Sequence, residues 1–273
     1  MKARLPGLLA LAIPVLAGIA YLVLMGAPVS YAILNAAALG IAALLLLLAP
    51  ALPDIKIRRV ISVALIVLLF FPLITGPYIN GIARWLPLGP FTLHSGALFF
   101  PALVVLAARD EDFAPPMLLA ALLAATLQPD AATSLAVMLA AVGLYTARDD
   151  WRMVPVAGIA FFASLVAGLR GELPAQPFVE RVLVHLALEA PAGAFVLALA
   201  LLASFFLLAH GLTADKPVRH GLAGALFGFS LAALVSNYPT ILVGYGASPI
   251  LGFGLAIGLA TATTRRTASD TTR

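Results

Sequence analysis

Three ionisable side chains, Arg181, His185 and Glu189, recur every four residues in an otherwise apolar part of the sequence. On a helix this spacing places them along one stripe, with Glu180 turned about 100° away. An ionisable group in a membrane span costs at least ~2.5 kcal/mol, so such a stripe needs water or partners. The pattern predicts a polar cavity in which Glu180 or Glu189 acts as a base and Arg181 faces a phosphate. The alternative is a set of residues at i, i+4 spacing that pair with one another at the membrane interface.

A second group of polar residues lies near predicted turns. Asp130 follows a proline, which cannot donate a backbone hydrogen bond, so a helix must end or restart there. We predict that the Asp130 carboxylate caps the following helix through the N–H groups near Thr133. Trp85 beside Arg84 is a candidate for ligand binding, and is equally typical of an anchor at the membrane interface. His94 precedes an apolar run and is interpreted as a structural histidine.

The residues that the sequence lacks exclude several kinds of chemistry. It has no cysteine, which excludes disulfides, thiolate metal sites and cysteine nucleophiles. It has no His-x-x-x-His or Glu-x-x-His spacing, P-loop, dinucleotide fingerprint or Gly-x-Ser-x-Gly elbow. Basic residues suggest nucleic acid in a soluble protein, but here they are interpreted as determinants of membrane topology. We therefore expect no nucleic-acid partner and no metal ligands.

The composition indicates that a bilayer surrounds most of the chain. Of its 273 residues, 63% are hydrophobic and 10% are charged, and the mean hydropathy is +1.08. Soluble domains are about half apolar and about a quarter charged. Glycines, prolines and charges divide the sequence into ten apolar segments: 6–25, 29–50, 59–76, 95–108, 113–128, 131–147, 153–169, 182–209, 219–236 and 243–264. We predict an all-α polytopic membrane protein of about ten transmembrane helices, with residues 1–273 forming a single integral membrane domain.

The basic residues predict the orientation. If the N-terminus is cytoplasmic and every segment crosses, thirteen of the sixteen Lys and Arg residues lie inside, and Arg84, Arg170 and Arg181 lie outside. This positive-inside asymmetry favours both termini in the cytoplasm, in the inner membrane of a bacterium. The first apolar run, 6–25, is longer than a usual signal core and is predicted to be an uncleaved span. Residues 265–273 are predicted to form a disordered cytoplasmic tail.

Four stretches resemble motifs of one membrane-protein family. Residues 84–94 resemble Arg-Trp-x-x-Leu-Gly-x-Phe-x-x-Gln, and residues 127–135 resemble Gln-Pro-Asp-Leu-Gly-Thr-Ala-Leu, the most specific of the four. Residues 244–249 are similar to Ser-Tyr-Gly-Gly-Ser-Ser, and residues 173–194 resemble a large outer loop with the helix that follows it. In this order they resemble the SEDS family (shape, elongation, division and sporulation) of membrane glycosyltransferases, which have ten spans and a cytoplasmic N-terminus.

The resemblance implies polymerisation of a polyprenyl-diphosphate-linked glycan precursor, of the peptidoglycan type, at the outer face of the inner membrane. The family's catalytic aspartate falls at Val179 or Glu180, so Glu180 is the implied base that deprotonates a sugar hydroxyl. The implied substrate-binding residues are Arg84, Trp85, Asp130, Arg181, His185, Tyr245 and Ser248. No cofactor is implied, and a divalent cation is left open. The implied partners are membrane lipid, the polyprenyl-linked substrate and a single-span penicillin-binding-type or divisome protein.

Departures from the family pattern support two other hypotheses. Over residues 94–100 the family's Gln-Pro-Ser-Glu-Leu-Ala-Lys has lost both its glutamate and its lysine, and the outer loop is shorter. The alternative is therefore a catalytically degenerate member that acts as a scaffold or lipid-precursor binder in an envelope or cell-division complex. A third hypothesis is a small-solute transporter in which Asp130, His185 and Glu189 relay protons, although no inverted repeat is evident.

Overall fold

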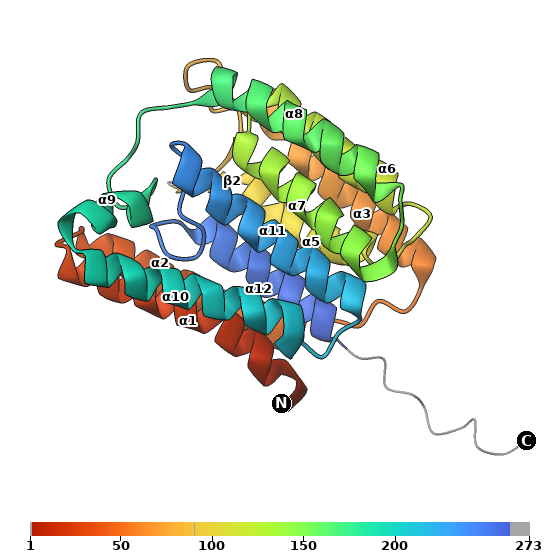
Figure 1. Ribbon diagram of the computed structural model, residues 1–273, viewed down its shortest axis with the longest axis horizontal. Coiled ribbons are helices and arrows are strands. Elements are labelled where there is room, and N and C mark those ends of the chain that lie inside the picture. The colour runs from red at the N-terminus through yellow and green to blue at the C-terminus, as the bar shows by residue number, and fades with distance from the viewer. Residues whose placement is uncertain (1, 90, 263–273) are drawn as a thin grey trace, which may run out of the picture.

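The apolar segments fold as helices in a computed structural model, which describes residues 2–89 and 91–262 (Figure 1). A short 3-10 helix, Lys2–Arg4, leads into α1 (Leu5–Leu24), and α2 (Val29–Leu48) packs beside it. The other helices are α3 (Ile55–Phe70), α4 (Pro72–Thr75), α5 (Ser95–Ala107), α6 (Ala114–Leu127), α7 (Ala131–Arg148), α8 (Met153–Gly171), α9 (Val182–Glu189), α10 (Pro191–Phe206), α11 (Lys216–Val235) and α12 (Ala247–Thr261). The predicted tail, 265–273, lies outside the described residues.

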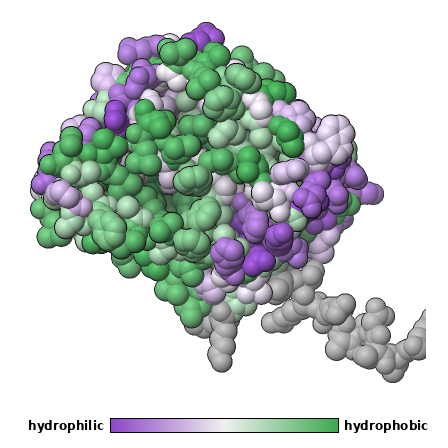
Figure 2. Space-filling model, viewed as in Figure 1, coloured by the Kyte–Doolittle hydropathy of each residue, from purple (hydrophilic) through white to green (hydrophobic). Residues whose placement is uncertain are grey.

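The prediction of an all-α polytopic membrane protein is confirmed. Within the described chain, seven helical segments are long and apolar enough to cross a membrane, and three shorter apolar helices, α5, α6 and α12, accompany them. Figure 2 shows a broad hydrophobic region, with hydrophilic residues gathered toward opposite ends of the molecule. Large apolar side chains are exposed on several helices and their ends, each at least 67% accessible: Leu24, Leu48, Ile74, Phe162 and Leu169. Lipid rather than water suits such a surface.

Helices α5 and α12 are short because protein surrounds them. α5 has 13 residues and α12 has 15, against roughly 20 for a full span. Most of their residues are buried, and the two helices pack against each other and against α2 and α3. A membrane protein tolerates a backbone end at this depth where protein or water shields it. The first turns of α5 and α12 therefore lie below the end of the bundle, which leaves space for a pocket above them.

Helices α7 and α11 approach each other closely and hold the bundle together beside that space. Gly224 and Gly228, one turn apart on α11, lie against the α7 backbone. A β-carbon on Gly224 would come within 2.2 Å of the Leu139 carbonyl oxygen, and one on Gly228 within 2.5 Å of the Leu135 carbonyl oxygen. Small residues at this spacing permit the close backbone contact that stabilises helix pairs in lipid.

The two ends of the bundle differ in structure and charge. One end carries an antiparallel hairpin of β1 (Trp85–Leu88) and β2 (Phe91–His94), in which Trp85 pairs with His94. We call this end, together with segments 172–181 and 236–246, the hairpin face. The opposite end, which we call the basic face, is formed by segments 49–54, 108–113, 149–152 and 212–215.

One segment predicted to be continuous is broken. The apolar run 182–209 forms two helices, because Pro191 has no N–H with which to continue the hydrogen bonding of α9. Between them, Ala190 has a φ of −144° and a ψ of 78°, outside the helical region. A π-helical turn, Leu207–Gly211, then ends this segment. α9 is therefore a separate short helix at the hairpin face, toward the left of Figure 1.

Candidate functional site

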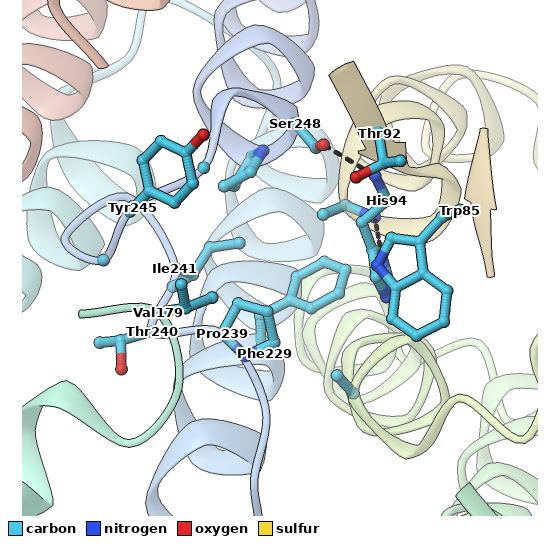
Figure 3. Close-up of a pocket in the computed structure, with 15 residues that line it drawn as sticks. Trp85, Thr92, His94, Val179, Phe229, Pro239, Thr240, Ile241, Tyr245 and Ser248 are labelled. Atoms are coloured by element: carbon cyan, nitrogen blue, oxygen red, sulfur yellow. Dashed lines mark hydrogen bonds between the residues drawn. The ribbon is translucent and has the colours of Figure 1, made fainter. Parts of the chain in front are cut away.

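A pocket of about 160 Å³ lies at the hairpin face, between the β-hairpin and the start of α12. Figure 3 shows Trp85 and His94 on one side of the pocket, with Ser248 hydrogen-bonded to His94, and Tyr245 on the other side. All four stretches that resemble the SEDS pattern contribute to its lining, since Val179 and Ala132 also belong to it. Its other lining residues include Thr92, Phe229, Pro239, Thr240 and Ile241.

Asp130 is buried beside this pocket and caps α7. Its Oδ1 accepts a hydrogen bond of 3.1 Å from the Thr133 N–H, and its Oδ2 accepts one from the Thr133 hydroxyl. The predicted cap is confirmed. The Nε2 of His94 lies 3.4 Å from the same Oδ2. A buried carboxylate needs such partners, so this cluster joins the start of α7 to the hairpin.

His94 connects the hairpin with α5 and α12. Its Nδ1 accepts a hydrogen bond of 3.1 Å from the Ala97 N–H and so caps α5. Its backbone N–H donates to the Ser248 hydroxyl at 2.8 Å. Because Nδ1 is an acceptor, Nε2 of the neutral ring carries the proton and lies toward Asp130. Since Nδ1 uses its lone pair to accept from Ala97 and Nε2 carries the proton, the neutral ring of His94 has a positioning role and no free lone pair with which to act as a base.

Arg84 holds the hairpin onto the bundle. Its guanidinium lies 4.8 Å from the ring centroids of both Trp85 and Tyr238. Its Nη1 donates to the Pro129 carbonyl at 3.4 Å, and the residue is 3% exposed. Buried cation–π contacts of this kind fix a guanidinium in place. Arg84 is not among the residues that line the pocket.

The sequence did not single out two residues that organise the site, Tyr238 and Asn35. The Tyr238 hydroxyl accepts a hydrogen bond of 2.9 Å from the Ala131 N–H and ties segment 236–246 to α7. The Asn35 side chain donates to the Gly244 carbonyl and accepts from the Gly246 N–H, each at 3.1 Å. Asn35 is the one side-chain amide in the apolar run of α2. A lone amide in such a run predicts a hydrogen bond to another part of the bundle, and this signal could have identified it.

Segment 172–181 runs antiparallel to segment 236–246. The Thr240 N–H donates to the Val179 carbonyl at 2.9 Å, and Glu180 pairs with Pro239 as an isolated bridge. Val179 lines the pocket, whereas the Glu180 carboxylate accepts a hydrogen bond of 2.6 Å from the Gln176 N–H and is not part of the lining. Burial raises the pKa of Glu180, and the hydrogen bond from Gln176 opposes that shift.

The stripe of Arg181, His185 and Glu189 does not meet the pocket. Arg181 precedes α9 with a φ of 52°, while His185 and Glu189 are exposed. The polar cavity predicted along this stripe does not form among the described residues, because the short helix α9 turns that face outward. Asp130 is buried, and among the described residues no ion pair or side-chain hydrogen bond joins it to His185 or Glu189.

An apolar groove of about 460 Å³ adjoins the pocket. It lies between α2, the hairpin and the start of α12, and its apolar lining includes Leu34, Ile41, Leu88, Phe91, Leu93 and Leu251. The pocket and the groove share Thr92, Tyr245, Gly246 and Ser248. The pocket and the groove therefore lie side by side, separated by these shared residues. Across residues 2–89 and 91–262, no three His, Asp or Glu side chains are grouped to hold a metal ion.

Solved structures share this fold. The crystal structure of the rod shape determining protein RodA from Thermus thermophilus matches with a TM-score of 0.69 at 22% identity, over 94% of this chain and 95% of that one. An aspartate-to-alanine mutant of that RodA matches with a TM-score of 0.68 at 22% identity, over 94% and 96%.

A chain in a structure of a peptidoglycan synthase complex, described as coordinating polymerization and crosslinking, matches with a TM-score of 0.60 at 21% identity, over 93% and 94%. No protein-family model matches the sequence, and no curated protein is significantly similar to it. The chain has the fold of RodA, which confirms the polytopic helical fold implied by the resemblance.

Proposed function

We propose that this chain is a divergent SEDS-type protein that binds a polyprenyl-diphosphate-linked glycan precursor on its hairpin face, at the outer side of a bacterial inner membrane. The adjacent pocket and apolar groove carry this proposal. Such a precursor has a polar glycan, an anionic diphosphate and a long hydrocarbon chain. A site that places a pocket with polar groups from His94, Thr240 and Ser248 beside an apolar groove matches that combination. The pocket is small, so it accommodates only part of the glycan head.

The proposed orientation is supported by the positive charges. Among the described Lys and Arg residues, Arg84, Arg170 and Arg181 lie at the hairpin face and the others lie toward the basic face. Segments that flank membrane spans carry their excess of Lys and Arg on the cytoplasmic side. The hairpin face is therefore the outer one in this proposal, which places the pocket where lipid-linked precursors are polymerised in the family that the sequence resembles.

The start of α12 supports an anionic group at the junction of pocket and groove. No described side chain caps this helix, and its N-cap residue, Gly246, has a φ of 155°. The first N–H groups of a helix and its dipole favour a negatively charged ligand. Since neither Arg84 nor Arg181 lines the pocket, we assign the diphosphate contact to this helix end. Ser248, in its first turn, already accepts the His94 N–H.

Equilibrium binding of a polyprenyl-diphosphate-linked disaccharide-peptide to purified protein in detergent tests the proposal. Tyr245→Ala is expected to weaken binding roughly 10- to 100-fold, because burying an aromatic side chain contributes roughly 1.5–3 kcal/mol. Tyr245 is suited to the test because it lines both cavities, while its ring stacks on Tyr31 at 3.7 Å. The matched control is Tyr145→Ala, an exposed tyrosine near the other end of α7. Equal affinities for the two variants would contradict the assigned site.

A second candidate is a glycosyltransferase in which Glu180 is the base. The observation in its favour is that Glu180 directly follows a residue of the pocket wall, and that burial raises its pKa as a base at neutral pH requires. Glu180→Gln is then expected to abolish glycan polymerisation while precursor binding persists. Full polymerisation by this variant would remove Glu180 from the role.

Val179→Asp tests whether the pocket is a glycosyltransferase site that has lost its catalytic base. The substitution places a carboxylate in the pocket wall at a position where the family's catalytic aspartate falls. If the chain is a precursor binder that has lost its base, wild-type protein binds precursor without turnover and Val179→Asp gains measurable polymerisation. Gln176→Asp, at an exposed position of the same segment and outside the pocket lining, is the matched control and gains none.

A protein partner belongs to the proposal, because one similar structure is a chain of a peptidoglycan synthase complex. We propose a single-span penicillin-binding-type or divisome protein. Affinity purification of the chain from membranes tests this directly. A stoichiometric partner of that type, recovered with no turnover of precursor, would favour the scaffold form of the function, while recovery of the chain alone would contradict the partner.

A further inference from the structure

A second cavity, of about 570 Å³, lies at the basic face, at the opposite end of the bundle from the pocket. Segment 49–54 and the end of α12 form part of its wall, and segment 212–215 forms another part. Arg58, in the first turn of α3, and Arg109, just after α5, complete the charged lining. None of these residues contributes to the pocket or the groove of the hairpin face.

Neither of these two arginines has an ion-pair partner within 4 Å in the described chain. The Nε of Arg58 is buried and makes no hydrogen bond with any described residue. Arg109 donates one hydrogen bond, of 2.8 Å, to the Ala260 carbonyl. By contrast, the adjacent Arg59 binds Asp110 through two hydrogen bonds, of 2.7 and 3.2 Å. The arginines of the cavity therefore differ from their neighbour in keeping donors free.

The charges around the cavity also favour an anion. Burial lowers the pKa of Arg109, the carboxylate of Asp215 opposes that shift, and the charge of Arg58 adds to it. Two guanidinium groups that repel each other are both stabilised when an anion lies between them. The planar fork of donors on arginine matches the oxygens of a phosphate.

We propose that this cavity binds the phosphate of an anionic phospholipid headgroup in the membrane leaflet at the basic face. Apolar residues flank segment 49–54 on both sides, with Leu48 76% and Ile57 49% exposed, so acyl chains have a surface beside the cavity. Basic pockets between helices on the cytoplasmic side are where anionic lipid headgroups bind. In the proposed orientation this leaflet is the cytoplasmic one. The cavity shares no lining residue with the pocket or the groove of the hairpin face, so lipid binding here does not depend on precursor binding there.

Lipid titration of the purified full-length protein in neutral detergent tests this proposal. The probe is dioleoylphosphatidylglycerol, with dioleoylphosphatidylcholine and inorganic phosphate as comparisons, and affinity is measured by native mass spectrometry. Arg58→Gln is expected to weaken phosphatidylglycerol binding roughly 10-fold or more, because hydrogen bonds between charged groups are the strong ones. Asp215→Asn is expected to tighten it, since the carboxylate of Asp215 opposes the ligand's charge. Arg58→Lys, which keeps the charge and loses the planar fork, is expected to bind less tightly than wild type.

Lys56→Gln is the matched control, because it removes one exposed positive charge two residues from Arg58 and outside the cavity lining. Equal losses in Lys56→Gln and Arg58→Gln would show diffuse surface attraction and overturn the proposal. Unchanged affinity in folded Arg58→Gln and Arg58→Lys would also overturn it, as would inorganic phosphate binding as tightly as the lipid. Truncation after Ala262 is expected to leave the affinity unchanged. Loss of binding on truncation would assign the lipid to residues 263–273 instead.

Discussion

Replacement of Asp130 tests whether the polar cluster beside the pocket holds the hairpin face in place. Asp130→Ala removes the cap of α7, which costs about 1 kcal/mol. It also leaves the buried hydroxyl of Thr133 without its acceptor, which costs about 1–3 kcal/mol more. The free energy of unfolding is therefore expected to fall by about 2–4 kcal/mol. His94 loses its neighbour in the same variant.

Asp130→Asn is expected to fall between wild type and Asp130→Ala. Its side-chain oxygen can still cap α7, but its amide N–H group then meets either the Thr133 hydroxyl or the protonated Nε2 of His94. The loss is expected to be about 1–2 kcal/mol, since one buried hydrogen bond is broken and no cavity is made. Unfolding in mixed micelles by increasing denaturant, followed by tryptophan fluorescence, ranks the three proteins.

Asp149→Asn is the control for this series. Asp149 is exposed at the other end of α7 with a φ of 56°, a conformation that asparagine adopts readily, so this variant is expected to stay within about 0.5 kcal/mol of wild type. If Asp130→Ala also unfolds within that margin, the cluster does not stabilise the fold and the positioning role argued for Asp130 and His94 is wrong.

Three more substitutions probe the same face. Gly96→Ala is expected to lower the free energy of unfolding by about 1–3 kcal/mol, because its β-carbon would lie 1.9 Å from the Thr133 hydroxyl oxygen, whereas Gly40→Ala, with open space around it, is expected to lose nothing in the same denaturation assay. Asn35→Ala leaves two backbone groups of the turn before α12 unpaired and is expected to weaken precursor binding and to speed hydrogen exchange of that turn. The pKa of Glu180 in the folded protein is raised above its ordinary value of 4.5. Ionisation of this carboxyl therefore costs more in the folded state than in the unfolded state, and the wild-type protein loses stability as pH rises from 4.5 through the folded-state pKa. Glu180→Gln is therefore expected to gain melting temperature relative to wild type as pH rises above about 4.5, and a difference that does not change with pH would contradict this.

Local features of the sequence were sufficient to predict much of the fold. The length of the apolar runs predicted the helical segments, because the bilayer fixes how much apolar chain a crossing requires. The cap by Asp130 was predictable for a similar reason, since the carboxylate and the Thr133 N–H are three residues apart. Pro191 also predicts the break between α9 and α10 from the sequence alone. We predicted one continuous segment because residues 182–209 are apolar on both sides of that proline.

The candidate site depends on contacts between residues distant in the sequence. Tyr238 meets Ala131 across 107 positions, and Asn35 meets Gly244 across 209, and neither pairing leaves a trace in local composition. His185 and Glu189 do lie on one helix, α9, as their spacing predicts. Which way α9 faces is decided by the break at Pro191 and by packing, and spacing carries no information on either.

The register of segment 172–181 decides how the hairpin face can act. Residues 177–179 form a turn that leads into the isolated bridge at Glu180, and in this arrangement Val179 lines the pocket whereas Glu180 does not. The Thr240 N–H to the Val179 carbonyl and the Val182 N–H to the Thr240 hydroxyl, each at 2.9 Å, fix this register. Bringing Glu180 into the pocket by a slip of one residue would break both bonds in a buried setting. Under the proposed function, transfer chemistry therefore requires either that rearrangement on binding or a carboxylate at position 179.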